Sequence, residues 1–437
     1  MPPSEATAAA EPGYWAWVPS AFSALRHRNY RLYWFGQVIS MSGTWMQRTA
    51  QGWLVTELVL IFIPKALAAG PTNLYLAIVS ASGTLPVLIF GFFTGFIADR
   101  FDKRRIVILT QVLMMVQAAI LTVLYYTKII NIPYLIALAV FLGVVAAIDM
   151  PARQGLVIEL TGRKDLPNAI ALNSGIFNAA RMIGPAVAGM LLAMHFTVGS
   201  AFLLNAVSYV AVVVALTMMR GRFTPHRDPQ AAQETTWQRV VAGFRFLATT
   251  HGLRRITIML SVISLLAAPF MPLLPSVARY QLGVGAADFG FLVACIGVGA
   301  VGGAFALALL SARRAHYVTL RAGYSLLLGG LIALSFARTF WLAAALLVFI
   351  GLGFIWTFAS TNIILQLRVP DYLRGRVMAA FSQVAMGMMP VGTLIVGVLA
   401  RAIGVSHAIL IGTSLAALIG GYLFIILRNH PLKMPAE

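Results

Sequence analysis

The sequence predicts an all-α membrane protein in which twelve transmembrane helices form two six-helix bundles around a central cavity. Three observations carry this prediction. Of the 437 residues, 60% are hydrophobic and only 10% are charged, whereas a soluble domain carries about 25% charged residues. Twelve stretches are apolar over the roughly 20 residues that a helix needs to cross a bilayer. The longest polar interruption, residues 221–255, separates six of these stretches from the other six.

The twelve spans differ in how many charges they contain. A helix satisfies all of its own backbone groups, so each span is predicted to be helical. Eight contain no Asp, Glu, Lys or Arg: residues 72–98, 106–127, 200–219, 256–278, 289–310, 339–367, 377–400 and 407–427. Four tolerate ionisable side chains: 32–60 with Arg48 and Glu57, 132–155 with Asp149 and Arg153, 168–196 with Arg181, and 317–337 with Arg321.

The positive charges predict the orientation of the spans. The chain has 32 Lys and Arg against 13 Asp and Glu, a net charge of +19. With twelve spans, 25 of the 32 fall on the side of the two termini and 5 on the other side. The positive-inside rule then predicts a multi-pass protein of the cytoplasmic (inner) membrane with both termini in the cytoplasm. The basic surplus reflects topology and membrane lipid, and we expect no nucleic-acid partner.

The same boundaries divide the chain into five parts. We expect an N-terminal cytoplasmic segment (1–28), an N-terminal bundle (29–220), a central cytoplasmic loop (221–255), a C-terminal bundle (256–428) and a C-terminal tail (429–437). The halves share a pattern: Asp165 precedes Pro185 by 20 residues, and Asp371 precedes Pro390 by 19. Both pairs follow the fourth span of their half. Parallel repeats of this kind are typical of secondary transporters, which bind substrate between the halves.

The loop after the second span carries a motif. Residues 95–105 read GFIADRFDKRR, which resembles the G-x-x-x-D-R-x-G-R-R/K signature of the major facilitator superfamily, with Asp102 in place of the second glycine. The resemblance implies the major facilitator fold and a conformational latch that closes on the N-terminus of the eleventh helix. Its residues would be Gly95, Asp99, Arg100, Lys103 and Arg104. A basic turn that serves only the topology is the alternative.

A second motif lies on the fifth span. Residues 180–189, ARMIGPAVAG, resemble the antiporter motif of the superfamily, with its Gly184, Pro185 and Gly189. Simple packing of small residues is the alternative. Further phrases resemble the enterobactin (siderophore) exporter branch, which also holds multidrug efflux proteins: residues 28–34, 43–47, 149–154, 168–173 and 369–378.

Charges inside spans are expensive, about 2.5–3.5 kcal/mol each on insertion scales, so each is expected to have a partner or a function. Asp149 pairs either with Arg181 on the next helix or with Arg153 one turn away. A buried carboxylate beside a movable cation suits proton coupling, and the candidates are Asp149, Arg181 and the rival Glu57.

In this superfamily helices 1, 4, 7 and 10 line the central cavity. Side chains on those spans are candidate substrate contacts, although each could face lipid or core instead. They are Gln47, Arg48, Gln51, Trp53, Phe270, Trp356 and Asn362.

Together these patterns predict a secondary active transporter. We expect a monomer that exports a hydrophobic or siderophore-like small molecule by alternating access, with protons moving in antiport. A lipid or lysophospholipid transporter of the same fold is the alternative. The single cysteine, Cys295, excludes an internal disulfide and a cysteine metal cluster. H-E-x-x-H and P-loop motifs are absent, so a membrane enzyme, a cofactor and a metal are not expected.

Overall fold

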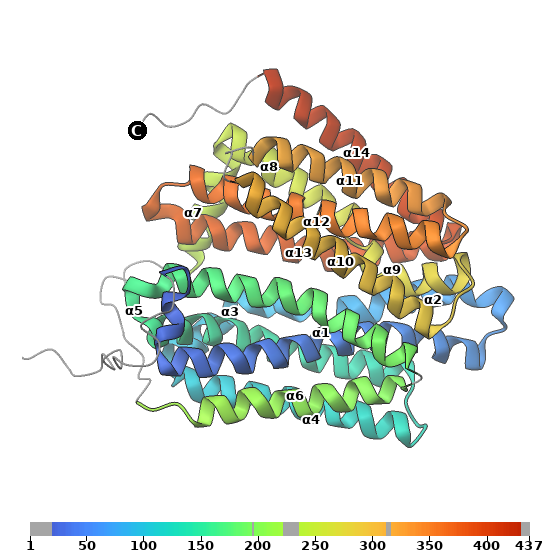
Figure 1. The fold of residues 1–437 in the computed structure, drawn as a ribbon, viewed down its shortest axis with the longest axis horizontal. Coiled ribbons are helices and arrows are strands. Elements are labelled where there is room, and N and C mark those ends of the chain that lie inside the picture. Colours follow the sequence, from blue (N-terminus) through green and yellow to red (C-terminus); the bar gives the residue numbers. More distant parts are fainter. Residues whose placement is uncertain (1–19, 195, 222–235, 312–315, 430–437) are drawn as a thin grey trace, which may run out of the picture.

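The computed structural model describes residues 20–194, 196–221, 236–311 and 316–429, and every regular element in them is a helix (Figure 1). The N-terminal half contains η1 (Ser20–Arg26), α1 (Arg28–Phe62), α2 (Lys65–Ser82), α3 (Leu85–Arg100), α4 (Lys103–Tyr126), α5 (Ile132–Ala193) and α6 (Val198–Thr217). The C-terminal half contains α7 (Thr236–Thr249), α8 (His251–Val262), η3 (Ile263–Ala267), α9 (Phe270–Ser276), η4 (Val277–Gln281), α10 (Ala286–Ser311), α11 (His316–Phe336), α12 (Phe340–Arg368), α13 (Asp371–Ile403) and α14 (Val405–Asn429).

Ten segments of the described chain are long and apolar enough to cross a membrane. They are Lys65–Gly91, Lys103–Tyr126, Ile132–Gly162, Lys164–Ala193, Val198–Thr217, Gly252–Gln281, Ala286–Leu307, His316–Phe336, Phe340–Arg368 and Val405–Ile426. The first and eleventh predicted spans correspond to α1 and α13. Helix α1 has 35 residues, about 52 Å at 1.5 Å per residue, but it carries many polar side chains. In α13 the apolar part is Gly387–Ile403.

Some helices extend further than the sequence predicted. The fourth and fifth spans form one element, α5, broken only at Gly162, so its helical turns include residues 156–161, which the sequence placed in a loop. The second span is divided into α2 and α3 at residues 83–84. Helix α7 lies within the predicted central loop, and residues 222–235 of that loop lie outside the described part.

The break in α5 depends on glycine. Gly162 has φ 68° and ψ 176°, a conformation that is open almost only to glycine because a side chain would clash with the backbone. Around the break, η1 packs against the second part of α5. His27 Nε2 lies 2.8 Å from Asp165 Oδ2, and Ser23 donates a hydrogen bond to Asp165 Oδ1. Asp165, the first residue of the Asp-to-Pro pattern in the N-terminal half, therefore binds the N-terminal segment through Ser23 and His27.

Replacing Gly162 with alanine is expected to lower the free energy of unfolding by about 1–3 kcal/mol, the cost of a strained backbone conformation. No atom from other parts of the molecule lies within 4 Å of the added Cβ, so the loss comes from the local backbone conformation alone. Gly175 on the same helix also has open space around its Cβ. Its replacement by alanine should be neutral or stabilise the helix by about 0.5–1 kcal/mol. Chemical unfolding in detergent measures the free energy of unfolding of both variants. Equal changes in the two would contradict the conclusion that the conformation of Gly162 requires glycine.

The seventh span contains two π-helical turns, η3 and η4, on either side of α9. Pro269, Pro272 and Pro275 lie in or beside α9. Proline lacks an N–H and its ring clashes with the carbonyl four residues earlier, so the regular hydrogen-bond ladder cannot continue. A π turn inserts a residue and relieves this conflict.

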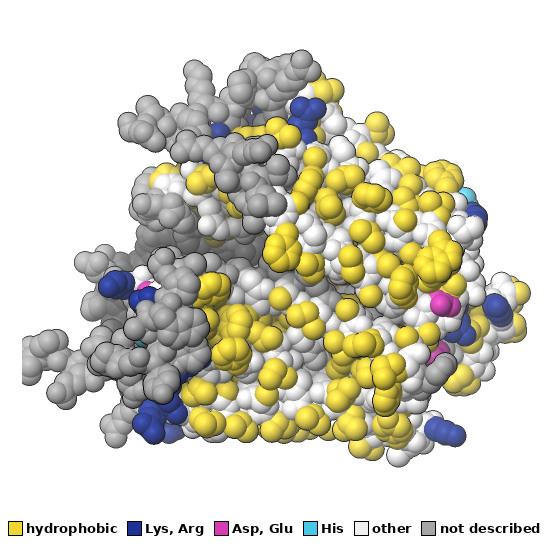
Figure 2. All heavy atoms as spheres, in the orientation of Figure 1, with side chains coloured by type: hydrophobic (Ala, Val, Ile, Leu, Met, Phe, Trp, Pro, Cys, Tyr) yellow, Lys and Arg dark blue, Asp and Glu magenta, His cyan; other side chains and the backbone are white. Residues whose placement is uncertain are grey.

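The two halves form two bundles, the N-terminal one below and the C-terminal one above in Figure 1. Lys and Arg gather toward the ends of the bundles and hydrophobic side chains cover the belt between them (Figure 2). We call the end that holds residues 100–105, 162–165 and 251–255 the basic end. The opposite end holds residues 62–65, 126–132 and 281–286.

The described contacts between the bundles gather toward the end opposite the basic end. Helix α5 packs on α10, α2 packs on α13 and α9, and α1 packs on α9. Thr72 Oγ1 lies 2.9 Å from the Tyr280 hydroxyl, and Asn73 donates to the carbonyl of Ala400 at 3.0 Å. At Gly189 and Gly290 the α5 and α10 backbones touch, and the added Cβ of either residue would overlap the other.

Candidate functional site

A pocket lies between the bundles, with empty space of about 480 Å³ that includes open solvent. Helix α5 contributes one wall, and three elements of the C-terminal bundle contribute the others. The lining residues are Arg181 and Pro185 from α5, Phe270 and Met271 from α9, Val293, Ile296, Gly297 and Ala300 from α10, and Gly351, Phe354 and Ile355 from α12. Arg181 is the one charged residue among them, so the pocket is an apolar space with a single cationic wall.

Two arginines meet at one tryptophan beside this pocket. The guanidinium carbons of Arg48 and Arg181 lie 5.2 and 5.5 Å from the centre of the Trp45 ring. Arg181 also lies 4.3 Å from the Phe354 ring, across the bundle interface. Cation–π contacts of this kind stabilise a charge by about 0.5–2 kcal/mol.

Small residues of the fifth span explain how Arg181 reaches α1. A Cβ at Gly184 would lie 2.6 Å from Trp45 Cβ and 2.8 Å from the backbone nitrogen of Met46. Glycine is therefore required for α5 to approach α1 at this level. Gly184 and Gly189 thus serve different contacts: Gly184 packs inside the N-terminal bundle, and Gly189 packs against the other bundle.

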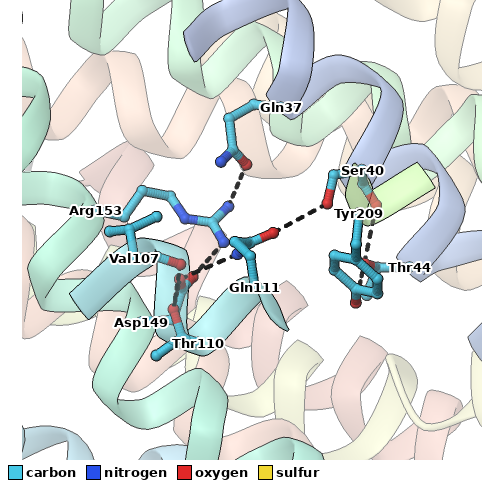
Figure 3. A network of polar contacts seen from close by, with 9 residues as sticks. All are labelled: Gln37, Ser40, Thr44, Val107, Thr110, Gln111, Asp149, Arg153 and Tyr209. Carbon is cyan, nitrogen blue, oxygen red and sulfur yellow. Dashed lines mark hydrogen bonds and ion pairs between the residues drawn. The ribbon is translucent and has the colours of Figure 1, made fainter. Parts of the chain in front are cut away.

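A polar network fills the N-terminal bundle at the level of Asp149 (Figure 3). Asp149 is buried and forms an ion pair with Arg153, one turn along α5. Its Oδ1 accepts hydrogen bonds from Thr110 (2.7 Å) and Gln111 (3.1 Å) of α4. Arg153 also donates to Gln37 Oε1 of α1 at 2.6 Å. Of the two alternatives left open by the sequence, the structure has the pair with Arg153, while Arg181 lies at Trp45.

The network continues across the bundle. Ser40 donates to Gln111 Oε1 at 3.2 Å, and Thr44 lies 3.0 Å from the Tyr209 hydroxyl of α6. Further along α1, a second group of hydrogen bonds joins Gln47 to Gln117 (3.1 Å) and to Asn205 (2.7 Å). These buried groups are satisfied by side chains from three helices, as buried polar groups must be.

Glu57 belongs to a separate cluster at the end opposite the basic end. It accepts a hydrogen bond from Trp53 Nε1 at 2.8 Å. Trp53 is buried and stacks on Phe289 of α10, with ring centres 5.1 Å apart. Arg279, from the C-terminal bundle, lies 5.3 Å from the Trp53 ring. This cluster joins the two bundles.

The other predicted cavity residues lie in different surroundings. Phe270 lies in the pocket wall, and Gln47 bonds inside the N-terminal bundle. Gln51 is buried. Trp356 donates to the carbonyl of Gly303 at 2.8 Å, and Asn362 accepts from Gln366. Their substrate roles stay predictions.

Two residues of the predicted latch, Gly95 and Asp99 on α3, lie outside the residues whose surroundings the structure describes. Arg100 is exposed at the end of α3. Lys103 forms an ion pair with Glu159 of α5, and Arg104 donates to the carbonyls of Leu216 and Thr217. These contacts lie within the N-terminal bundle, and the latch itself stays a prediction.

Sequence reasoning missed Trp45 and Phe354, which lie against the Arg181 guanidinium. A signal existed for Trp45, since it precedes Arg48 by three residues and so shares its helix face. Phe354 comes from the other bundle, which no local spacing can indicate. Among the described residues no group of three His, Cys, Asp or Glu could hold a metal ion.

Known proteins resemble the chain over nearly all of its length. Residues 19–435 match the family described as transmembrane secretion effector. The staphyloferrin A transporter of Staphylococcus aureus is 27% identical over 412 residues, which cover 90% of this chain and 95% of that protein. The multidrug efflux pump Tap of Mycolicibacterium fortuitum is 25% identical over 357 residues, covering 80% of this chain and 86% of the pump.

Solved structures agree on the fold. An auto-inhibited peptide transporter of the POT family has a TM-score of 0.69 at 12% identity, covering 94% of this chain and 98% of that one. A bacterial homologue of the lysosomal transporter Spinster, inward-facing and unoccupied, has a TM-score of 0.65 at 12% identity, covering 93% and 99%. The family and these relatives are transporters and not enzymes, as predicted. The chain therefore belongs to the transmembrane secretion effector family, in the siderophore and drug efflux branch of the major facilitator superfamily, and is a multi-pass membrane transporter.

Proposed function

We propose that the protein exports a hydrophobic or siderophore-like small molecule across the cytoplasmic membrane, by alternating access coupled to proton antiport. The relatives named for staphyloferrin A and for multidrug efflux support this substrate range. The basic end lies in the cytoplasm with both termini, as the positive-inside rule requires. The contacts at the other end then close the external side, and this conformation is the inward-facing one.

The observation that carries the proposal is the buried pair of Asp149 and Arg153. Protonation of Asp149 removes the charge that holds Arg153, and Arg153 keeps Gln37 as its remaining partner on α1. Because Gln37 and Trp45 are on the same helix, a shift of Arg153 acts on the helix whose Trp45 contacts Arg181 of the pocket wall. A carboxylate that is alternately paired and protonated is the element that proton antiport needs.

The test uses purified protein in liposomes with an imposed pH gradient and a panel of dyes, antibiotics and catecholate siderophores. The native protein should move at least one of them faster when the gradient is present. Asp149→Asn should lower gradient-driven transport at least about tenfold, since the amide cannot take up a proton, while exchange of substrate without a gradient persists.

The matched control is Asp288→Asn, which makes the same chemical change at an exposed carboxylate at the start of α10. Its transport should equal that of the native protein. If native transport ignores the gradient, or if Asp149→Asn still follows it, proton antiport through Asp149 is wrong.

A further inference from the structure

Arg48 and Arg181 lie within helices that cross the predicted membrane, and no carboxylate contacts either of them among the described residues. The structure describes six acidic side chains. Five of them have other partners: Glu57 with Trp53, Asp102 with the backbone of Arg105, Asp149 with Arg153, Glu159 with Lys103, and Asp165 with His27. The sixth, Asp288, is exposed at the start of α10.

Both arginines face the space between the bundles. Arg181 lines the pocket and contacts Phe354 of the opposite bundle. Arg48 is exposed although it lies in the middle of α1. It lies one turn before Gly52, whose Cβ position is 3.3 Å from Pro275 of α9, and positions four apart share a helix face. Met271, one turn before Pro275, lines the pocket, so Arg48 approaches the pocket from the side of α1.

The two guanidinium carbons lie at most about 11 Å apart, because they are 5.2 and 5.5 Å from the centre of the same Trp45 ring. Two cations at short distance repel each other, and the surrounding apolar wall strengthens that repulsion. Each charge is costly at membrane depth, and aromatic contacts offset only part of that cost. Such a pair is stabilised when an anion enters between or beside the two groups.

We propose that Arg48 and Arg181 form the anion-binding part of the substrate site, and that the cargo is an amphiphilic organic carboxylate. Guanidinium groups bind carboxylates through paired hydrogen bonds, which fixes orientation as well as charge. The apolar body of the cargo packs on Phe270, Met271 and Ile296, which line the same pocket. This inference rests on the proposed export function, which left the charge of the cargo open.

The experiment measures binding to the full chain in nanodiscs by scintillation proximity, with tritiated 4-biphenylcarboxylate as probe. Competitors are unlabelled 4-biphenylcarboxylate, the neutral 4-biphenylcarboxamide and the cationic 4-biphenylmethylamine, which share one apolar body. The native protein should bind the carboxylate at least about tenfold more tightly than the amide, as expected for hydrogen bonds to a charged group. The amine should bind most weakly.

Variants assign the preference to the two residues. Arg48→Gln and Arg181→Gln should each lower carboxylate affinity about tenfold, and the double variant should bind carboxylate and amide equally. Arg181→Lys should keep part of the preference because the charge remains. Arg279→Gln is the matched control, since Arg279 also lies over a tryptophan at the bundle interface but outside the pocket wall; it should keep the full preference.

Several results overturn the inference: no binding of the carboxylate, equal binding of carboxylate and amide by the native protein, or an unchanged preference in the double variant. The comparison of ligands on the native protein needs no variant, so a variant that fails to fold leaves the test intact. Binding and transport are separate readouts. Selective binding of the carboxylate without gradient-driven transport contradicts the proposed export and supports the anion site. Gradient-driven transport of neutral cargo alone supports the proposed export and contradicts the anion site.

Discussion

Replacing Gly189 with valine is expected to abolish transport, because the bundles can no longer close at the end opposite the basic end. The α5 and α10 backbones touch at Gly189 and Gly290, and even a single added Cβ overlaps the Gly290 peptide group. The neighbouring atoms belong to backbone, which cannot move aside as a flexible side chain does. Overpacking typically costs about 1–3 kcal/mol. A free-energy difference of this size shifts the equilibrium between the closed and open conformations of this end by about 5- to 150-fold.

Transport assays and thiol labelling measure this effect together. The reporter is Thr72→Cys in a Cys295→Ser background, because native Thr72 is buried where it contacts Tyr280. A membrane-impermeant maleimide should label this cysteine faster when Gly189 is replaced. Gly175→Val is the control, since no atom lies within 4 Å of its Cβ position. Unchanged labelling and normal transport in Gly189→Val would show that this contact does not gate the protein.

Replacing Arg153 with methionine is expected to lower the free energy of unfolding by about 3–5 kcal/mol, the usual cost of removing one partner of a buried ion pair. The variant leaves the Asp149 carboxylate, whose side chain is 5% exposed, without a cation. Thr110 and Gln111 still donate hydrogen bonds to it, but they do not neutralise its charge. Unfolding in mixed dodecyl maltoside and SDS micelles measures the loss.

Two comparisons make this measurement specific. Lys103→Met removes the cation of the Glu159 pair, where the carboxylate side chain left behind is 18% exposed. That side chain is more exposed than the Asp149 side chain, so the loss should be smaller. Adding Asp149→Asn to Arg153→Met should recover most of the stability, because no buried charge remains. Equal losses in the two single variants, or no recovery in the double variant, would contradict this reading of the network.

The sequence predicted the spans better than the contacts, for physical reasons. Apolar runs and loop charges depend on composition alone, and they place most helices within a few residues. The sequence predicted a loop between the fourth and fifth spans, but not that the break is confined to Gly162, because a glycine inside a polar turn does not reveal its own dihedral angles. The loop predicted over residues 221–255 contains the helix α7, which has 14 residues and is too short to be predicted as a membrane span.

The site shows the limit of such reasoning more clearly. Helical spacing identified Arg153 as one partner for Asp149, and adjacency of spans identified Arg181 as the other. The choice between them depends on how α5 is rotated against α1 and α4, which is a property of packing. The rotation of the second part of α5, after Gly162, directs Arg181 toward Trp45, and the approach of α12 then brings in Phe354. Neither contact follows from distance along the chain.

The π turn at Ile263–Ala267 bears on how this pocket can change during evolution. A π turn holds one residue more than the α-helical turn it replaces, and one residue corresponds to a rotation of about 100°. The orientation of Phe270 and Met271 in the pocket wall therefore depends on the number of residues before them as well as on their identity. A single deletion in this segment re-aims both side chains at once, so insertions and deletions here are a route to new specificity that substitutions one by one do not offer.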